Sequence, residues 1–456
     1  MKNKRLPLLG FWLLALYAAF AQRVETMQVP AAIGAPAVAG TVRNPAPGMS
    51  APVRVDPKIV AGQKKWSLSF AQRGITHGSP LPQSAIDSIK QAGNLLKEKR
   101  FRQGLDTALI LELPESGSPL TPTVNTSFKG NVSNGWAPPD NHIAVSDDGF
   151  LVSVCNSSIL FADESGAILQ QESFDDFLSA LNLPGYFFDP RVLYDPVEDK
   201  FILVVLSGNT PATSAVVIGF SEKSDPTGHW WLYAFDGDPT GSNLWFDYPS
   251  IGISTDDLYI SGNLYTANGN FSKALIYQLE KGPGFKSGSV TGIYWTGLKD
   301  ALGVPAFSLV PVSYGFDGSY GPGIYFISTY SQGGTDAMLW YTTANSKNNP
   351  GFYVHSVDIP NYYLPFDGLM KGSGDKLRIN DSQTLSGFFS DGTVHFVYNT
   401  RGDDLHAKIN YCRLNTNDLS PKIISIGLTP YEYAYPSVVP FAGSETDKSV
   451  LIGFLR

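Results

Sequence analysis

From residue 106 onward, apolar and polar positions alternate in short runs that are separated by turn sequences. The clearest unit spans residues 190–236, where RVLY, KFILVVLS, SAVVIGFS and HWWLYAFD are joined by DPVED, GNTPAT and EKSDPTG. β-Branched and aromatic runs of this length, bounded by Asp, Pro and Gly, are typical of strands. The unit therefore predicts a four-stranded antiparallel meander.

This four-strand unit recurs along the chain. Each copy opens with a turn residue before an apolar run, near Asp140, Asp189, Asp247, Pro305, Asp381 and Tyr435. A period near 50 residues made of four strands is the signature of a β-propeller blade. A β-sandwich explains the alternation and the turns but not the repeated unit. The sequence therefore predicts an all-β fold, a β-propeller of four-stranded antiparallel blades, with six blade starts visible and six or seven blades in a complete ring.

The sixth unit shows two strands, YPSVVPFA and SVLIGFLR, so the last blade is expected to be incomplete. A free blade edge exposes unpaired backbone groups. We therefore expect residues 106–128, with the runs TALILEL and PTVNTSF as strands, to pack beside the last blade and to pair with 449–455.

Three segments precede the propeller domain at 106–456. Residues 1–21 combine a basic start, an apolar run and the triplet Ala-Phe-Ala, which predicts a secretory signal peptide cleaved after Ala21. Residues 22–82 are rich in Pro, Ala and Gly and are interpreted as a linker. No later run is long and apolar enough to span a membrane. The mature protein is expected to be secreted or to lie at the outer cell surface.

Residues 83–105 predict a short basic helix. Ser84 is expected to be its N-cap, and Ile86, Ile89 and Leu96 its apolar face. The cluster KEKR near its end suits the helix dipole. We favour a solvated helix end as the meaning of this cluster, with attraction to an anionic surface as the alternative.

Charge is divided unevenly between the two parts of the chain. Of 33 Lys and Arg and 41 Asp and Glu, residues 1–105 hold 15 basic and 4 acidic residues, leaving 18 basic and 37 acidic residues in 106–456. An acidic domain repels phosphate backbones and attracts divalent cations, so no nucleic-acid partner is expected. Cys155 and Cys412 lie inside strand patterns, and we expect them to be buried free thiols.

When the blade openings are aligned, four of them have an aspartate at the same position, namely Asp140, Asp189, Asp247 and Asp381. In a propeller such positions would surround the mouth of the central channel. Carboxylates held so close repel one another unless they bind a hard cation such as Ca²⁺ or accept hydrogen bonds. We favour turn capping by each Asp, because no Ca²⁺-loop consensus accompanies them, and keep the metal site as the alternative.

Other candidate motifs are weaker. The histidines are scattered and lack zinc-ligand spacing, and no nucleophile elbow, phosphate loop or dinucleotide fingerprint occurs. The tripeptide Arg-Gly-Asp at 401–403 matches an adhesion motif, but so short a match often arises by chance. Trp230, Trp231 and Trp245 with Tyr248 could form a sugar-stacking platform, although aromatic residues between blades are ordinarily core.

Four motifs occur in order: Pro-Pro-Asp at 138–140, Asp-Pro-Arg at 189–191, Ser-Asp-Pro-Thr-Gly with a following Trp at 224–230, and Asp-Tyr-Pro at 247–249. With them the chain, over residues 128–456, resembles a family of uncharacterised secreted bacterial β-propeller proteins. The resemblance implies the fold and export, and no established activity. Members of that family continue into a blade with an Arg-Trp-Gly-Asp-Tyr motif and often a sorting domain, so the resemblance also implies a C-terminally truncated product.

Two functions follow as hypotheses. The first is a secreted or cell-surface binding or adhesion module, whose partner is a glycan or a cell-surface protein and whose channel could hold a cation. The alternative is a glycoside-active enzyme of the sialidase-like or lyase type, with an acid–base pair among the four aspartates. A sialidase would also need an arginine cluster, for which Arg191, Arg378 and Arg401 are candidates. We favour the binding module because the sequence carries no catalytic motif.

Overall fold

The structure, a computed structural model, describes residues 23–27, 37–38, 42–45, 51–55, 80–104, 123–131, 138–156, 158–370, 375–441 and 449–456. The signal peptide predicted at 1–21 and the predicted strand TALILEL lie outside these residues. None of the helices in the described ranges is long and apolar enough to cross a bilayer.

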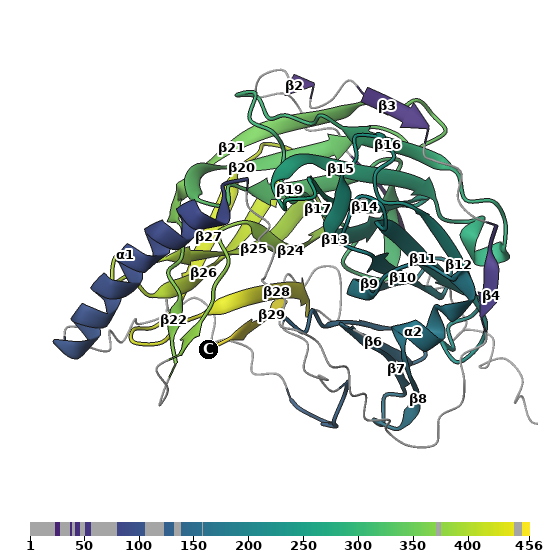
Figure 1. The fold of residues 1–456 in the computed structure, drawn as a ribbon, viewed down its shortest axis with the longest axis horizontal. Coiled ribbons are helices and arrows are strands. Elements are labelled where there is room, and N and C mark those ends of the chain that lie inside the picture. Colours follow the sequence, from purple (N-terminus) through teal and green to yellow (C-terminus); the bar gives the residue numbers. More distant parts are fainter. Residues whose placement is uncertain are drawn as a thin grey trace, which may run out of the picture.

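Six antiparallel sheets follow one another along the chain and form a β-propeller (Figure 1). The first blade consists of β5 (His142–Val145), β6 (Leu151–Cys155), β7 (Ser158–Ala162) and β8 (Ile168–Ser173). The second consists of β9 (Phe187–Asp195), β10 (Lys200–Ser207), β11 (Ala215–Ser221) and β12 (Trp230–Asp236). The third consists of β13 (Trp245–Ile253), β14 (Asp257–Tyr265), β15 (Phe271–Glu280) and β16 (Gly292–Thr296).

The fourth blade consists of β17 (Val310–Val312), β19 (Tyr325–Thr329), β20 (Gly333–Thr342) and β21 (Phe352–Tyr363). The fifth consists of β24 (Thr384–Ser390), β25 (Thr393–Arg401), β26 (Ala407–Asn415) and β27 (Pro421–Ile426). The sixth is the hairpin of β28 (Ala434–Pro440) and β29 (Val450–Leu455). The first strands of successive blades contact one another in the order β5, β9, β13, β17, β24, β28, which makes them the innermost strands. The predicted propeller of four-stranded antiparallel blades is confirmed.

Connecting elements are short. They are helix α2 (Phe174–Phe177), the 3₁₀ turns η1 (Ser179–Leu181) and η2 (Gly284–Lys286), strand β18 (Gly318–Gly321) and the hairpin of β22 (Gly368–Leu369) and β23 (Lys376–Leu377). Ser173 caps α2 by accepting a hydrogen bond from the Asp176 backbone N–H. These elements leave the six sheets as the frame of the molecule.

The N-terminal segment that the sequence analysis interpreted as a linker contributes strands to the propeller. β2 (Ala37–Val38) pairs with β21, β3 (Val42–Pro45) with β16 and β4 (Val53–Val55) with β12, all antiparallel. β1 (Arg23–Thr26) runs parallel to β18. Three consecutive blades thereby gain a fifth, outermost strand. We call β2, β3 and β4 together the edge strands.

Residues 123–131, which include most of the predicted strand PTVNTSF, form no strand in the structure. They lie against the first blade instead, where the Asn131 side chain donates to the Ser153 carbonyl oxygen at 3.2 Å and the Ser158 hydroxyl donates to Asn131. In the described part of the chain β29 pairs with β28. The expected pairing of residues 123–128 with the last blade is therefore wrong, because side-chain hydrogen bonds hold this segment elsewhere.

The core lies between neighbouring blades and is rich in aromatic side chains. Trp230 of β12 is fully buried and stacks on Phe161 of β7, with ring centroids 6.0 Å apart. Trp245 is buried as well, so Trp230 and Trp245 belong to the core rather than to a sugar-stacking platform. Cys155 and Cys412 are buried and free, as predicted.

Helix α1 (Gln83–Arg102) forms where the sequence predicts a helix, but its ends and faces differ from the expectation. Its N-cap is Pro82, without a side-chain cap, and Ser84 lies within the first turn. Ile86 is buried as expected, whereas Ile89 and Leu96 are exposed. Polar side chains take their place against the propeller, because the propeller presents carboxylates there.

Candidate site at the starts of the innermost strands

Polar side chains from four blades meet where the innermost strands begin. They are Asp140 before β5, Asp189 and Arg191 in β9, Asp247 and Tyr248 in β13, and Asp381 before β24. We call these six residues the axial cluster.

Electrostatic coupling shows which members of the axial cluster lie together. Burial raises the pKa of Asp189 well above its usual range, and the charges of Asp140 and Asp247 raise it further. Burial likewise raises the pKa of Tyr248, with Asp381 as the next contribution and Arg191 opposing it. The structure therefore brings Asp140, Asp189 and Asp247 together, and it couples Asp381 to Tyr248.

The backbone at these strand starts repeats from blade to blade. The dipeptides Asp189-Pro190, Tyr248-Pro249 and Tyr435-Pro436 each sit at a bulge, and their first residues have φ of 48°, 61° and 54°. The left-handed region is uncommon for residues other than Gly, and for a bulky residue such as Tyr it stores strain that the surrounding fold must support. Such strain is a frequent mark of functional sites.

This repeat corrects the alignment of the four aspartates. The residue equivalent to Asp189 is Tyr248, because both precede the proline of the bulge, whereas Asp247 lies one position earlier. Asp381 lies before β24 and outside its bulge. Aligning the prolines at 190 and 249 rather than the aspartates would have found Tyr248 from the sequence.

Asn156 holds the first two aspartates in place. Its side-chain nitrogen donates to Asp140 Oδ2 at 2.5 Å and to the Pro138 carbonyl oxygen at 2.9 Å, while its Oδ1 accepts the Asp189 backbone N–H at 2.8 Å. A hydrogen bond between the Asp140 and Asp189 carboxyl groups also raises the pKa of Asp189. This contact favours the protonated form of Asp189.

The other two aspartates accept local backbone hydrogen bonds. Asp247 Oδ1 accepts the Tyr248 N–H at 2.9 Å, and Asp381 Oδ1 accepts the Gln383 N–H at 3.0 Å. Burial raises the pKa of Asp381 to about 7, although the positive charge of Lys90 opposes this shift. These two positions fit the turn-capping interpretation.

One buried polar atom beside the axial cluster, His142 Nδ1, has no hydrogen-bond partner among the described residues. The Tyr265 side chain is 2% exposed, and its hydroxyl, which hydrogen-bonds with Asn263, also lies in the field of Asp247, Tyr248 and Asp381. Burial and the charge of Arg191 lower the pKa of His142 to about 4, so its imidazole is neutral at pH 7. Buried polar atoms nearly always have a partner, so the His142 nitrogen is a position where a polar group could bind.

Across the described ranges, no group of three or more His, Cys, Asp or Glu side chains is placed to hold a metal ion. The Ca²⁺ site at Asp140, Asp189, Asp247 and Asp381 therefore stays a prediction. A cation would have to draw further ligands from backbone or amide oxygens.

The candidate arginines lie apart. Arg191 Nε donates to the Pro249 carbonyl oxygen at 2.8 Å and belongs to the axial cluster. Arg378 pairs with Asp87 of α1 at 3.2 Å, and Arg401 lies over the ring of Phe366, 4.8 Å from its centroid. These three residues do not form the arginine cluster that a sialidase-like site would need.

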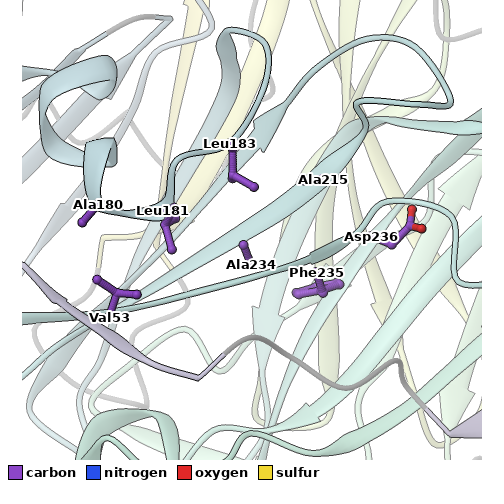
Figure 2. Close-up of a pocket in the computed structure, with 8 residues that line it drawn as sticks. All are labelled: Val53, Ala180, Leu181, Leu183, Ala215, Ala234, Phe235 and Asp236. Carbon is purple, nitrogen blue, oxygen red and sulfur yellow. The ribbon is translucent and has the colours of Figure 1, made fainter.

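A separate, apolar cavity of about 330 Å³ lies at the outer edge of the second blade, between β4, η1 and the strands β11 and β12 (Figure 2). Its lining is Val53, Ala180, Leu181, Leu183, Ala215, Ala234, Phe235 and Asp236. Sequence analysis gave no sign of it, because the edge strand that forms one wall was interpreted as linker.

No protein-family model matches the chain, and no curated protein matches its sequence. Among solved structures, the WD40 domain of SCAP from fission yeast is similar, with 12% identity over 69% of this chain and 75% of that one and a TM-score of 0.33. A subtype N10 neuraminidase-like protein (A/little yellow-shouldered bat/Guatemala) shows 10% identity over 69% and 90%, with a TM-score of 0.38. An exo-β-1,3-galactanase from Clostridium thermocellum shows 12% identity over 66% and 64%, with a TM-score of 0.33. These similarities are too distant to assign an activity, so the site is interpreted from its own geometry.

Proposed function

We propose that this chain is a secreted or cell-surface propeller of the bacterial family that its motifs resemble, and that it acts as a binding or adhesion module. Its ligand is a polar molecule, a glycan of a cell surface or of a surface protein, held at the axial cluster. The observation that carries this proposal is the meeting of polar side chains from four blades beside the His142 Nδ1 atom, which has no partner among the described residues.

The chemistry of the axial cluster suits hydroxyl groups. The carboxyl groups of Asp140, Asp189 and Asp247 accept hydrogen bonds, while Arg191 and Tyr248 can donate them. A carbohydrate hydroxyl does both and carries no charge, so it meets neither the repulsion of the carboxylates nor that of the guanidinium. The Tyr248 ring adds an aromatic surface of the kind that sugar rings contact.

A glycan array probed with the purified full chain tests this proposal. We expect the Asp189→Asn and Tyr248→Phe variants to lose at least tenfold in retention, because each loses a polar contact at the ligand, about 1.4 kcal/mol or more. Asp163→Asn is the matched control, since Asp163 caps a surface turn of the first blade away from the axial cluster. Unchanged retention in both site variants would contradict the proposal.

A cation in the axial cluster is the second part of the proposal, because a divalent ion could offset the repulsion between the neighbouring carboxyl groups that raises the pKa of Asp189. Millimolar Ca²⁺ should then raise the melting temperature through preferential binding to the folded state, and Asp189→Ala or Asp247→Ala should remove most of that gain. If each Asp only caps its turn, each variant should lose roughly 1 kcal/mol with no dependence on calcium. Equal melting temperatures in calcium and in chelator would rule out the ion.

A glycoside-active enzyme is the second candidate, and the carboxyl pair is the observation that favours it. The raised pKa of Asp189 beside Asp140 suits the role of a general acid that protonates a leaving oxygen, while a partner carboxylate acts as base or nucleophile. A panel of chromogenic glycosides and polysaccharides tests this candidate. Turnover that Asp189→Asn abolishes would support the enzyme, and binding without turnover would support the module.

A further inference from the structure

Helix α1 lies on the outside of the propeller (Figure 1). Two of its lysine side chains face the propeller, and most of its large apolar side chains face outward. Lys90 and Lys97 are buried against the propeller at 3% and 0% exposure, whereas Ile89, Leu95 and Leu96 are 49%, 60% and 51% exposed. A surface helix ordinarily turns its apolar stripe toward the core and its charged residues toward water. These three apolar side chains of α1 are therefore exposed and available for a contact outside the chain.

The inner face of α1 is fixed by specific polar contacts, so the helix cannot roll to bury its leucines. Lys97 Nζ pairs with Glu432 Oε1 at 2.8 Å and donates to the Asp367 carbonyl oxygen at 2.6 Å. Lys90 pairs with the Asp367 carboxylate at 3.2 Å. Asn94 donates to Asp367 Oδ2 and accepts the Asp367 backbone N–H. Rotating the helix would break all of these contacts at once.

The outer face of α1 also carries positive charge at its C-terminal end. Leu95, Lys99 and Arg102 follow one another at i, i+4 and i+7, so they share one face. The Arg102 side chain is 80% exposed, and its guanidinium lies 3.8 Å from the Glu98 carboxylate. The acidic Glu98 between them pairs with Lys376 at 2.7 Å, which offsets its charge. The exposed face thus combines leucines with basic groups.

We propose that this face of α1 docks the protein onto an anionic lipid surface. Leucines that enter the headgroup region and basic side chains that meet anionic lipids are the two components of interfacial binding by an amphipathic helix. Charge complementarity selects an anionic partner, because Lys99 and Arg102 lie on the face that carries the exposed leucines. An anionic bilayer repels the propeller and attracts the basic end of α1, which fixes the orientation of the docked protein.

Vesicle flotation with the purified full chain tests the proposal. We expect binding to vesicles of equal parts phosphatidylglycerol and phosphatidylcholine, weaker binding at high salt, and none to phosphatidylcholine alone. The double variant Leu95→Ser/Leu96→Ser should lose at least tenfold in partition. Lys99→Gln should lose about fivefold, the equivalent of one basic contact near an anionic surface.

Matched controls separate this face from general surface properties. Leu302 is 78% exposed on a loop and Lys223 is exposed on another, so Leu302→Ser and Lys223→Gln should bind as the unsubstituted chain does. All variants change exposed side chains and should keep the melting temperature. Asp189→Asn should also bind vesicles normally, because docking does not depend on the axial cluster.

Three results would overturn the proposal. Equal binding of the double serine variant would show that α1 is not the contact. Capture by a soluble polyanion such as heparin, sensitive to Lys99→Gln but not to the serine pair, would assign the face to a charged polymer. Self-association that the serine pair abolishes, without any vesicle binding, would assign it to a second copy of the chain.

Discussion

Replacing Lys97 by Met tests how α1 is held against the propeller. The Lys97 side chain is fully buried, and its ammonium group pairs with Glu432. Met keeps the length and most of the volume of the side chain but removes the charge. The Glu432 carboxylate would then stay buried with two partners, His406 Nδ1 at 2.9 Å and the Ala407 N–H at 2.8 Å.

The structure sets the size of the expected effect. Removing one partner of a buried ion pair costs about 3–5 kcal/mol, because the other charge is left without its counterion. Burial lowers the pKa of Lys97, which shows that its charged form is itself disfavoured there. Because Glu432 also keeps two hydrogen bonds, the low end applies. We expect Lys97→Met to weaken the docking of α1 by about 3 kcal/mol.

Hydrogen exchange of the α1 amides is the suitable assay, because helix release leaves the blades folded. The opening free energy of α1 should fall while that of β14 stays unchanged. The double variant Lys97→Met/Glu432→Gln should recover part of the loss, since it leaves no buried charge. Lys99→Met is the control, because Lys99 is exposed and lies two residues along the helix from Lys97. This variant should change the opening free energy by less than about 0.5 kcal/mol.

The reasoning fails if Lys97→Met costs less than about 1 kcal/mol, the value of an ordinary exposed pair. It also fails if the double variant loses the sum of the two single effects. Either result would mean that the apolar contacts of α1, such as that of Ile86, hold the helix without the ion pair.

Three further predictions concern the propeller. Burial raises the pKa of Asp381 to about 7, so between about pH 4 and 7 the folded protein keeps a proton that the unfolded chain releases, and stability falls as pH rises. In urea unfolding, Asp381→Asn should remove up to about 1.4 kcal/mol per pH unit of that fall. An unchanged dependence of the unfolding free energy on pH would refute this prediction. Trp230→Leu should lower stability by about 3 kcal/mol in the same assay, because it opens a cavity beside Phe161, and a loss below about 1 kcal/mol would mean that the blades repack. Asn156→Ala should cost about 1–3 kcal/mol by leaving the Asp189 N–H without its partner, which an unchanged melting temperature would contradict.

The blades could be predicted from the sequence because each has its own local signal. In KFILVVLS and SAVVIGFS the apolar runs and the turn residues between them mark both strands and their connection, and the structure pairs Ile202 with Phe220 in that hairpin. The hairpin turn brings together residues that lie close in sequence, so a local pattern suffices.

The rest of the structure depends on partners far away in sequence. The edge strands are two to four residues long and use the backbone edges of finished blades, so they need no apolar alternation of their own. From the sequence, Lys90 and Lys97 are expected to be solvated helix residues. Their partners, Asp367 and Glu432, lie more than 270 positions away in the sequence, so only the folded structure shows these contacts. The equivalence of Tyr248 and Asp189 depends on a bulge, whose sequence signal is the proline that follows each residue rather than the repeated aspartate.

The edge strands impose an order on folding. β2, β3 and β4 lie near the N-terminus, but the blade edges that they complete end at Tyr363, Thr296 and Asp236, respectively. A ribosome or an export channel therefore releases each of these strands before its partner exists, and each can pair only after its own blade has formed. Until then three blade edges stay open to other chains. The edge strands thus wait for strands made much later, and they close the edges through which an unfinished molecule would aggregate.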